Sequence, residues 1–300
     1  MTRNTLTRNQ IALLATGDEI VNGDILNTNA QIIAQKIFGS GMQIGLHITV
    51  GDNTTDIAHT VQFLLQSHKA LIITGGLGPT SDDLTRFALG AALNRELVFD
   101  EQAWAHICER FKLLGYTDSP PESNRQQALF PEGAIIIPNP NGTAAGCQIT
   151  HNGAIIFMLP GPPFECLPMV DSWVMPALKK ALPQKISYYE HWLLFGVSEG
   201  LIAEQLDKIA APFHCVTGYR LAYPYIEFKI FSQNEEDFRA VIPLLEAAVA
   251  PYLISNGKEA ASVTLKNKLA TLPGILAIRD RVTGGLLESL IKSPQNFDHA

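Results

Sequence analysis

Apolar runs alternate with segments of helical periodicity through the first half of the chain. Strands are predicted where the runs are short and end at glycine or polar residues, over 10–16, 42–50 and 69–76. Helices are predicted where apolar residues share one helical face, over 27–41, 53–68 and 82–93. This alternation predicts an α/β fold, a three-layer doubly wound sheet. Ligands of such sheets bind beyond the carboxyl ends of the strands.

The pattern continues with a helix over 101–116 and a short strand that runs into a turn-rich loop within 134–146. Residues 147–161 predict a hairpin that turns at Asn152–Gly153. Pro162 and Pro163 follow, and they suit the first turn of a helix.

The character of the chain changes near 182–186. A second, small α+β domain is predicted from a strand, a helix with Ser198 as its N-cap, a further strand and a helix containing Pro243, over 188–198, 198–209, 224–233 and 234–253. Beyond residue 257 the pattern weakens to a short helix over 262–270 and the strand-like "GILAIRD". We therefore expect three parts, over 9–180, 185–255 and 257–300.

Composition limits the partners. The net charge of −7 and the absence of a basic stripe argue against nucleic-acid binding. The four cysteines show neither Cys-x-x-Cys pairs nor zinc-site spacing. The polar N-terminus lacks the apolar core of a signal peptide, and no apolar run reaches the ~18–20 residues that span a bilayer. We expect a cytoplasmic protein without a membrane or nucleic-acid partner.

The stretch "ITGGLGPTSDDLT" (73–85) joins a predicted strand to a predicted helix. Glycines let a ligand approach the backbone, and a helix N-terminus presents free N–H groups, so the stretch is typical of a phosphate site. Thr80 or Ser81 is expected to cap the helix or to donate to a phosphate. Alternatively, Asp82 and Asp83 merely favour the helix dipole, by about 0.3–1 kcal/mol each.

Carboxylates beside a bound phosphate would repel it unless a divalent cation lies between them. Mg²⁺ suits this arrangement, because it accepts one or two carboxylates together with phosphate oxygens and waters. Asp83 would then be a metal ligand or would orient the attacking water. Further acids at predicted strand ends could supply carboxylates, although each alone is better explained as a cap or turn residue: Asp18, Glu19, Asp24 and Asp52.

The same stretch resembles the signature of the molybdopterin-binding, MoaB/MogA-like fold. Six motifs resemble those of the CinA (competence/damage-inducible) proteins and occur in the same order: "TGDEIVNGDILNTNA", "VGDN", "GGLGPTSDDLT", "SNRQQALFP", "PNPNGTAAG" and "MLPGPPFE". By this resemblance residues 9–180 form the nucleotide-pyrophosphate-binding domain and 185–255 a KH-like domain. The latter has no Gly-x-x-Gly loop, so RNA binding is not expected.

The resemblance implies metal-dependent hydrolysis of ADP-ribose to AMP and ribose 5-phosphate. We also expect a homodimer. The related molybdopterin enzymes move an adenylyl group, and both reactions act on a phosphoanhydride. A non-catalytic protein that binds molybdopterin or a nucleotide is the alternative. By motif, the catalytic residues are Asp83, Asp52 and Thr85, with Asp83 and Asp52 holding the metal.

The motifs also supply a set of residues expected to contact the substrate: Thr16, Gly17, Asp18, Glu19, Asn27, Gly75, Gly76, Gly78, Thr80, Ser81, Asn124, Arg125, Asn141, Thr143, Gly161 and Glu165. The forked guanidinium of Arg125 would suit a phosphate, or equally a surface ion pair.

The final segment departs from the family. CinA proteins continue into a deamidase domain for nicotinamide mononucleotide, which opens with Ala-Glu-Ser-Cys-Thr-Gly-Gly; here the matching stretch is "RDRVTGG" (279–285). Arg281 stands at the position of the serine nucleophile and Asp280 at that of the glutamate, and an arginine cannot supply a nucleophilic hydroxyl. The chain ends at Ala300. We expect no deamidase activity, and interpret 257–300 as a remnant.

Overall fold

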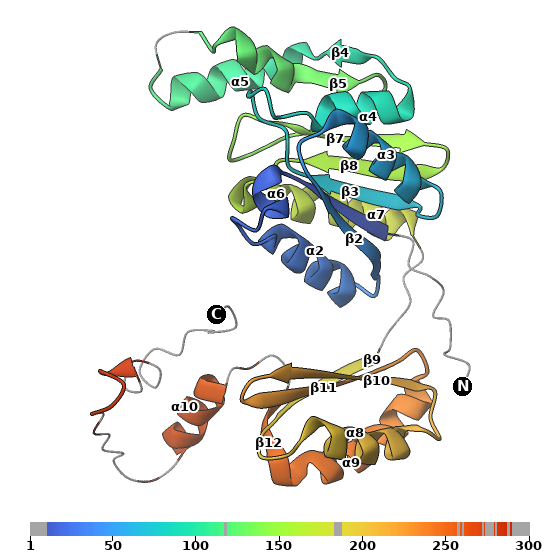
Figure 1. Cartoon of the computed structure of the whole chain (residues 1–300), viewed down its shortest axis with the longest axis vertical. Coiled ribbons are helices and arrows are strands. Elements are labelled where there is room, and N and C mark those ends of the chain that lie inside the picture. Colours follow the sequence, from blue (N-terminus) through green and yellow to red (C-terminus); the bar gives the residue numbers. More distant parts are fainter. Residues whose placement is uncertain are drawn as a thin grey trace. The chain divides into compact units, whose positions relative to one another are not determined.

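The computed structural model describes residues 11–116, 119–182, 188–256, 259, 261–271, 273, 279, 281–286 and 289. The chain divides into two compact units between Gln184 and Lys185, and each is described by itself (Figure 1). Within the described residues no helix is both long and apolar enough to cross a bilayer.

The first unit is built on a six-stranded sheet with the order β2-β1-β3-β8-β7-β6. Four neighbouring strands, β2, β1, β3 and β8, are parallel. Strand β7 runs antiparallel to β8, and β6 runs antiparallel to β7. The strand bounds are β1 Ile11–Thr16, β2 Ile44–Val50, β3 Ala70–Thr74, β6 Ile135–Ile137, β7 Gly146–His151 and β8 Ala154–Leu159. A separate two-stranded sheet consists of β4 Leu97–Phe99 and β5 Leu129–Pro131.

Helices cover both faces of the sheet. In β1, Ala12 and Leu14 belong to one apolar cluster and Ile11 and Leu13 to the other, so the strand is buried on both sides. Helices α3 Thr54–Leu65, α4 Thr85–Leu93 and α5 Glu101–Leu113 belong to the first cluster. Helices α2 Thr28–Gly39, α6 Pro163–Met169 and α7 Met175–Ala181 belong to the second. The predicted three-layer fold is confirmed.

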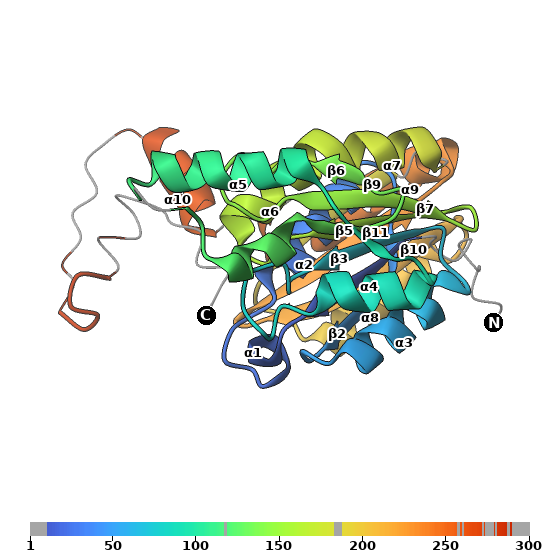
Figure 2. The ribbon, with the colours of Figure 1, turned by 90° about the horizontal axis from the view of Figure 1, so that it is seen from above.

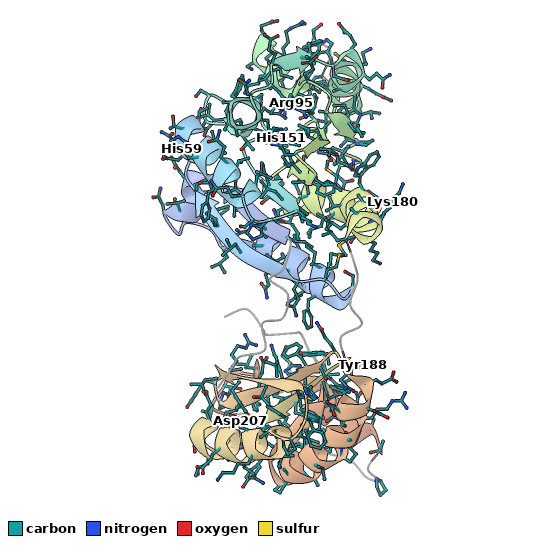
Figure 3. The ribbon with its side chains drawn as sticks, turned by 90° about the vertical axis from the view of Figure 1, so that its right-hand side faces the viewer. His59, Arg95, His151, Lys180, Tyr188 and Asp207 are labelled. Atoms are coloured by element: carbon teal, nitrogen blue, oxygen red, sulfur yellow. The ribbon has the colours of Figure 1, made fainter. Side chains whose placement is uncertain are left out.

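The views agree with this layering. In Figure 2, α3 and α4 lie side by side on one side of β3 and β7, and α7 lies on the other. Figure 3 shows His59 of α3 and Lys180 of α7 on opposite sides of the unit. The remaining elements are the one-turn helix α1 Asp18–Val21, the 3-10 helix Glu122–Ala128 and a π-helical segment Val170–Val174 that joins α6 to α7.

The predicted hairpin and the predicted proline start of α6 are confirmed, and the structure shows two further helix caps. The β7–β8 hairpin turns at Asn152 and Gly153, whose φ angles of 48° and 81° are those of a type I′ turn. Pro162 is the N-cap of α6 and Pro163 its first residue. Asn27 and Asn53 cap α2 and α3 by accepting hydrogen bonds from first-turn N–H groups.

The second unit has a four-stranded antiparallel sheet, in the order β10-β11-β9-β12. Its elements are β9 Tyr188–Leu194, α8 Glu199–Ala210, β10 Cys215–Ala222, β11 Tyr225–Ser232, α9 Glu235–Val249, a 3-10 turn Ala250–Tyr252, β12 Leu253–Asn256 and α10 Ala261–Thr271. Ser198 caps α8 as predicted. The core contains Trp192 stacked on Phe228, with ring centroids 5.2 Å apart. Of the strand-like 274–280, only Arg279 is among the described residues.

Candidate functional site

Four parallel strands end at the same edge of the first sheet, and each continues into a glycine. These are Gly17 after β1, Gly51 after β2, Gly75 after β3 and, after Pro160, Gly161 beyond β8. Because β7 runs the other way, the loop that precedes it reaches the same edge at the start of its strand. A cavity of about 650 Å³ lies among these loops.

Its lining comes from three regions of the first unit. The β1 loop and the start of α2 supply Thr16, Glu19, Ile20, Ile25, Leu26, Asn27, Thr28 and Asn29; the glycine loop and its neighbour supply Thr74, Gly75, Gly76, Leu77, Gly78, Pro79, Asp83 and Gln127; the third region supplies Thr143, Ala144, Pro160, Gly161, Pro162, Pro163 and Glu165.

The glycine loop, residues 75–83, has a conformation that only glycine tolerates at two positions. Gly75 and Gly76 have φ angles of 105° and 62°. A side chain on Gly75 would collide with the carbonyl oxygen of Thr16, and one on Gly76 with the hydroxyl of Thr85. The hydroxyls of Thr16 and Thr85 lie 2.9 Å apart, and Thr85 is fully buried. Thr85 therefore supports the loop from behind and does not face the cavity.

Asp83 organises the same loop. Its Oδ1 accepts from the Gly78 N–H at 2.7 Å, and its Oδ2 accepts from the Thr80 N–H at 2.9 Å and from the Thr80 hydroxyl. A side chain on Gly78 would collide with this carboxylate. Asp83 also lines the cavity, so it holds the loop and faces a ligand site at once.

The helix that follows starts later than predicted. It begins at Thr85, its N-cap is Leu84 and no side chain caps it, so the prediction of Thr80 or Ser81 as the cap is wrong. Asp82 and Asp83 both precede the helix, which has no acid in its first turn, so dipole stabilisation does not explain them. The bonds from Gly78 and Thr80 to Asp83 keep these residues in a loop.

Asp52 and Asp18 join two of the loops by reciprocal hydrogen bonds. The Asp18 N–H donates to Asp52 Oδ2, and the Asp52 N–H donates to Asp18 Oδ1, each at 3.0 Å. Burial raises the pKa of Asp52, the hydrogen bond from Asp18 opposes this rise, and the negative charges of Asp18, Glu19 and Asp82 add to it. Neither Asp18 nor Asp52 is among the cavity-lining residues.

Arg86 and Gln127 hold the glycine loop by donating hydrogen bonds to the Leu77 carbonyl. The sequence analysis selected neither residue. Arg86 is fully buried, and its Nη2 donates to the Leu77 carbonyl at 2.6 Å. Gln127 Nε2 donates to the same carbonyl at 3.3 Å, and Asn124 Nδ2 donates to Gln127 Oε1 at 2.9 Å. The only signal in the sequence is a charged residue inside the otherwise apolar segment "TRFALGAAL".

The third region is built on Asn139, which is fully buried and also was not predicted. Its Oδ1 accepts from the N–H groups of Asn141 and Gly142, and its Nδ2 donates to Glu165 Oε2 at 2.6 Å. Asn141 Nδ2 donates to the Phe164 carbonyl. Asn141 thus joins two loops but is not a lining residue, whereas Glu165 lines the cavity.

The structure brings ten of the predicted substrate and catalytic residues to the cavity: Thr16, Glu19, Asn27, Gly75, Gly76, Gly78, Asp83, Thr143, Gly161 and Glu165. The others are not among its lining residues: Gly17, Asp18, Asp52, Thr80, Ser81, Thr85, Asn124, Arg125 and Asn141. Arg125 instead pairs with Glu122 at 3.3 Å and stacks over the Phe99 ring at 4.5 Å, which favours the ion-pair interpretation.

The cavity lining carries acids without bases. Glu19, Asp83 and Glu165 contribute carboxylates, and no lysine, arginine or histidine occurs among the described residues of the lining. Among the described residues, no three His, Cys, Asp or Glu side chains are grouped so that they could hold a metal ion by themselves. A metal ion in this cavity would therefore need oxygen atoms of a bound substrate and of water to complete its coordination.

Comparison with known proteins gives the family. Residues 12–180 match the model of the probable molybdopterin binding domain. A CinA-like protein of Escherichia coli (strain SMS-3-5 / SECEC) is 35% identical over 284 residues, which cover 93% of this chain and 70% of the relative. A CinA-like protein of Shewanella sediminis (strain HAW-EB3) is 33% identical over 287 residues, which cover 93% of this chain and 66% of the relative.

A solved structure agrees. The crystal structure of the protein CinA from Thermoplasma acidophilum, a protein described as of unknown function, is 30% identical with a TM-score of 0.51. The match covers 58% of this chain and 98% of that one. This chain spans about two thirds of the length of the curated relatives it matches. With the domain match and the identity over nearly its full length, the chain belongs to the CinA-like protein family and carries that family's molybdopterin-binding domain.

Proposed function

We propose that the first unit is a metal-dependent hydrolase of a nucleotide pyrophosphate such as ADP-ribose. The observation that carries this proposal is the cavity at the strand ends, where a glycine loop meets three carboxylates and no cationic side chain lines the wall. Such a wall repels a phosphate ligand unless a divalent cation accompanies it.

The donor set fits a hard cation shared with the ligand. Mg²⁺ needs only one or two protein carboxylates when phosphate oxygens and waters fill its other positions. Asp83 would hold the ion, because it lines the cavity and its Oδ1 accepts one hydrogen bond among the described residues. Glu19 is the acid of the β1 loop that lines the same cavity. We leave Asp52 out of the metal site, since it lies outside the lining and bonds to Asp18.

The protein's own groups bind and orient the ligand. Gly75, Gly76 and Gly78 line the cavity and carry no side chain, so a phosphate can approach the backbone at these positions. When bound, the metal ion would neutralise phosphate charge and lower the pKa of an attacking water. Thr85 and Thr16 keep the loop in place, so their contribution is positioning.

The test is a hydrolysis panel of ADP-ribose and related pyrophosphates with Mg²⁺, Mn²⁺ and other divalent ions. Asp83→Ala is expected to lose at least about 100-fold in turnover, as removal of a group that stabilises developing charge commonly does. The matched control is Asp82→Ala, which removes the neighbouring acid outside the cavity lining and should keep turnover within twofold of the wild-type rate. Unchanged turnover in Asp83→Ala would remove this residue from the mechanism.

A non-catalytic binding protein for a nucleotide or pterin is the second candidate. The observation in its favour is that both oxygens of Asp83 already accept hydrogen bonds from the glycine loop. A rise in the unfolding temperature with ADP-ribose or a pterin nucleotide, without product under any metal condition, would favour this candidate.

We also propose that this chain has no nicotinamide mononucleotide deamidase activity. Arg281, an exposed residue, occupies the position of the serine nucleophile, and it offers no hydroxyl for attack. The purified protein should release no ammonia from nicotinamide mononucleotide. Release above a heat-denatured control would refute the proposal.

A further inference from the structure

The peptide between Leu77 and Gly78 is held from both sides by opposite charges. Its carbonyl accepts from the Arg86 guanidinium at 2.6 Å, and its N–H donates to the Asp83 carboxylate at 2.7 Å. In a planar trans peptide the C=O and N–H bonds point in opposite directions. Arg86 and Asp83 therefore lie on opposite sides of this peptide. The cation faces the negative, carbonyl end of the peptide dipole, and the carboxylate faces its positive, N–H end.

Burying the Arg86 guanidinium in this position costs free energy. Arg86 is fully buried, and its Nε and Nη1 have no hydrogen-bond partner among the described residues. Burial lowers the pKa of Arg86 to about 10, so the side chain is still charged at neutral pH. Removing a charge and its hydrogen-bonding groups from water is costly, and incomplete hydrogen bonding leaves part of that cost uncompensated.

Two groups near Arg86 could carry a compensating negative charge, Cys147 and Asp83, and Asp83 is the one that is ionised. Cys147 also lies close, but burial raises the pKa of its thiol to about 12, so it is neutral. The negative charge of Asp83 raises the pKa of Arg86 by Coulombic attraction and so opposes part of the effect of burial. Gly78 completes the arrangement, because any side chain there would push the Asp83 carboxylate away.

We propose that Arg86 is a positioning residue whose buried guanidinium, opposite Asp83, clamps the Leu77–Gly78 peptide and so holds the glycine loop ready for the anionic phosphate group of a ligand. The ligand class rests on the proposed function, whereas the clamp itself does not. The positive charge of the buried Arg86 guanidinium also offsets part of the repulsion between the three carboxylates of the cavity and a phosphate.

The first test needs no ligand. Amide hydrogen exchange at Gly78 and Thr80 is compared in the full chain and in Arg86→Met and Arg86→Lys. Without the guanidinium the peptide can rotate away from Asp83, so exchange in Arg86→Met should be at least tenfold faster at both amides, with the strand β3 amides unchanged. Lysine keeps the charge and one donor, and should restore part of the protection. Wild-type protection at Gly78 in both variants would overturn the proposal.

The second test measures binding of inorganic pyrophosphate with Mg²⁺ by titration calorimetry. Arg86→Met should bind about tenfold or more weakly, because the charged hydrogen bond to the Leu77 carbonyl is lost, and the affinity of Arg86→Lys should lie between the two. The matched control is Arg95→Met, because Arg95 also donates to two backbone carbonyls, those of Glu132 and Thr150 (Figure 3). Its affinity should equal that of the wild type.

The outcomes separate the two proposals. If the wild-type chain binds no pyrophosphate, the proposed function fails and the exchange rates alone decide the clamp. If the wild-type chain binds and Arg86→Met binds within twofold of it, the clamp is overturned while the proposed function stands. Should Arg86→Met not fold, Arg86→Lys carries both measurements, and wild-type values in it would overturn the proposal.

Discussion

Gly76 shows how strictly one residue of the candidate site is determined. Its φ of 62° and the nearby Thr85 hydroxyl leave no room for a side chain. Gly76→Ala should lower the free energy of unfolding by about 1–3 kcal/mol, from backbone strain and the displaced Thr16–Thr85 pair. Chemical denaturation measures this. The control is Gly39→Ala in α2, where nothing lies within 4 Å of the added methyl group and little change is expected. Equal stabilities of the two variants would contradict the assignment of Gly76 as a position without room for a side chain.

Asp52 gives a pH-dependent prediction. Because burial raises its folded-state pKa above the ordinary value of 3.8, its stabilising contribution is complete below that pH and is lost as pH rises through the folded-state pKa. Asp52→Asn can still accept the Asp18 N–H but carries no charge. The stability of this variant relative to the wild type should therefore increase from pH 3 to pH 7, as followed by denaturant unfolding.

A control separates this effect from simple charge removal. Asp24→Asn removes an exposed acid from the same loop region, and its relative stability should rise less over that range. A difference between Asp52→Asn and wild type that stays constant with pH, or falls as pH rises, would refute the prediction.

At the residue scale, the sequence predicted what is local and missed what depends on tertiary contacts. The positive φ of Gly75 and Gly76 could be expected from a strand that ends in two glycines. The roles of Arg86 and Asn139 could not, since Arg86 of α4 bonds to Leu77 of the glycine loop, and Asn139 bonds to Glu165, 26 positions away. The hydrogen bonds of Asp52 with Asp18, 34 positions away, are of the same kind.

Elements were predictable where apolar periodicity and turn chemistry agreed. The β7–β8 hairpin and the caps Asn27, Asn53 and Ser198 follow from local signals. The start of α4 was misplaced, because Asp83 bonds back to Gly78 and Thr80 in place of capping. Strand β10 was missed, because Gly218 and Arg220 interrupt its apolar pattern and pairing with β11 determines its structure.

Helix α4 offers a prediction at this scale. It ends at Asn94, whose φ of 52° and ψ of 51° are left-handed. Glycine has no steric penalty in this conformation, so Asn94→Gly should stabilise the protein by about 0.5–1 kcal/mol. Asn94→Ala is the matched variant and should destabilise the protein, because alanine has neither the backbone freedom of glycine nor the polar side chain of asparagine. Thermal unfolding of both variants decides, and the reverse order would contradict the assigned helix end.

On the scale of the whole molecule, each unit has its own apolar core. The first contains two clusters on either face of one sheet, and the second contains a single cluster around Trp192. We expect a fragment of residues 1–184 to fold alone, because no cluster of the first unit includes a residue of the second. Circular dichroism and a cooperative melt of the fragment test this; a non-cooperative melt would show that the first unit depends on the second.

The assembly state is a further prediction for the whole chain. We propose a homodimer to which the segment beyond residue 255 contributes. Light scattering of the full chain should then give twice the mass of one chain, and a chain truncated near residue 255 should give a lower average mass. A dimer of unchanged strength after truncation would assign the contact to another part of the molecule.

The turn at Asn152–Gly153 has a use that follows from strand direction. It connects the carboxyl end of β7 to the amino end of β8, so it lies at the sheet edge opposite the cavity, with His151 beside it (Figure 3). A fluorophore or a surface tether attached there leaves every ligand-facing loop unmodified. Immobilised through this turn, the molecule would present its cavity to the solution, which suits single-molecule measurements of ligand residence time.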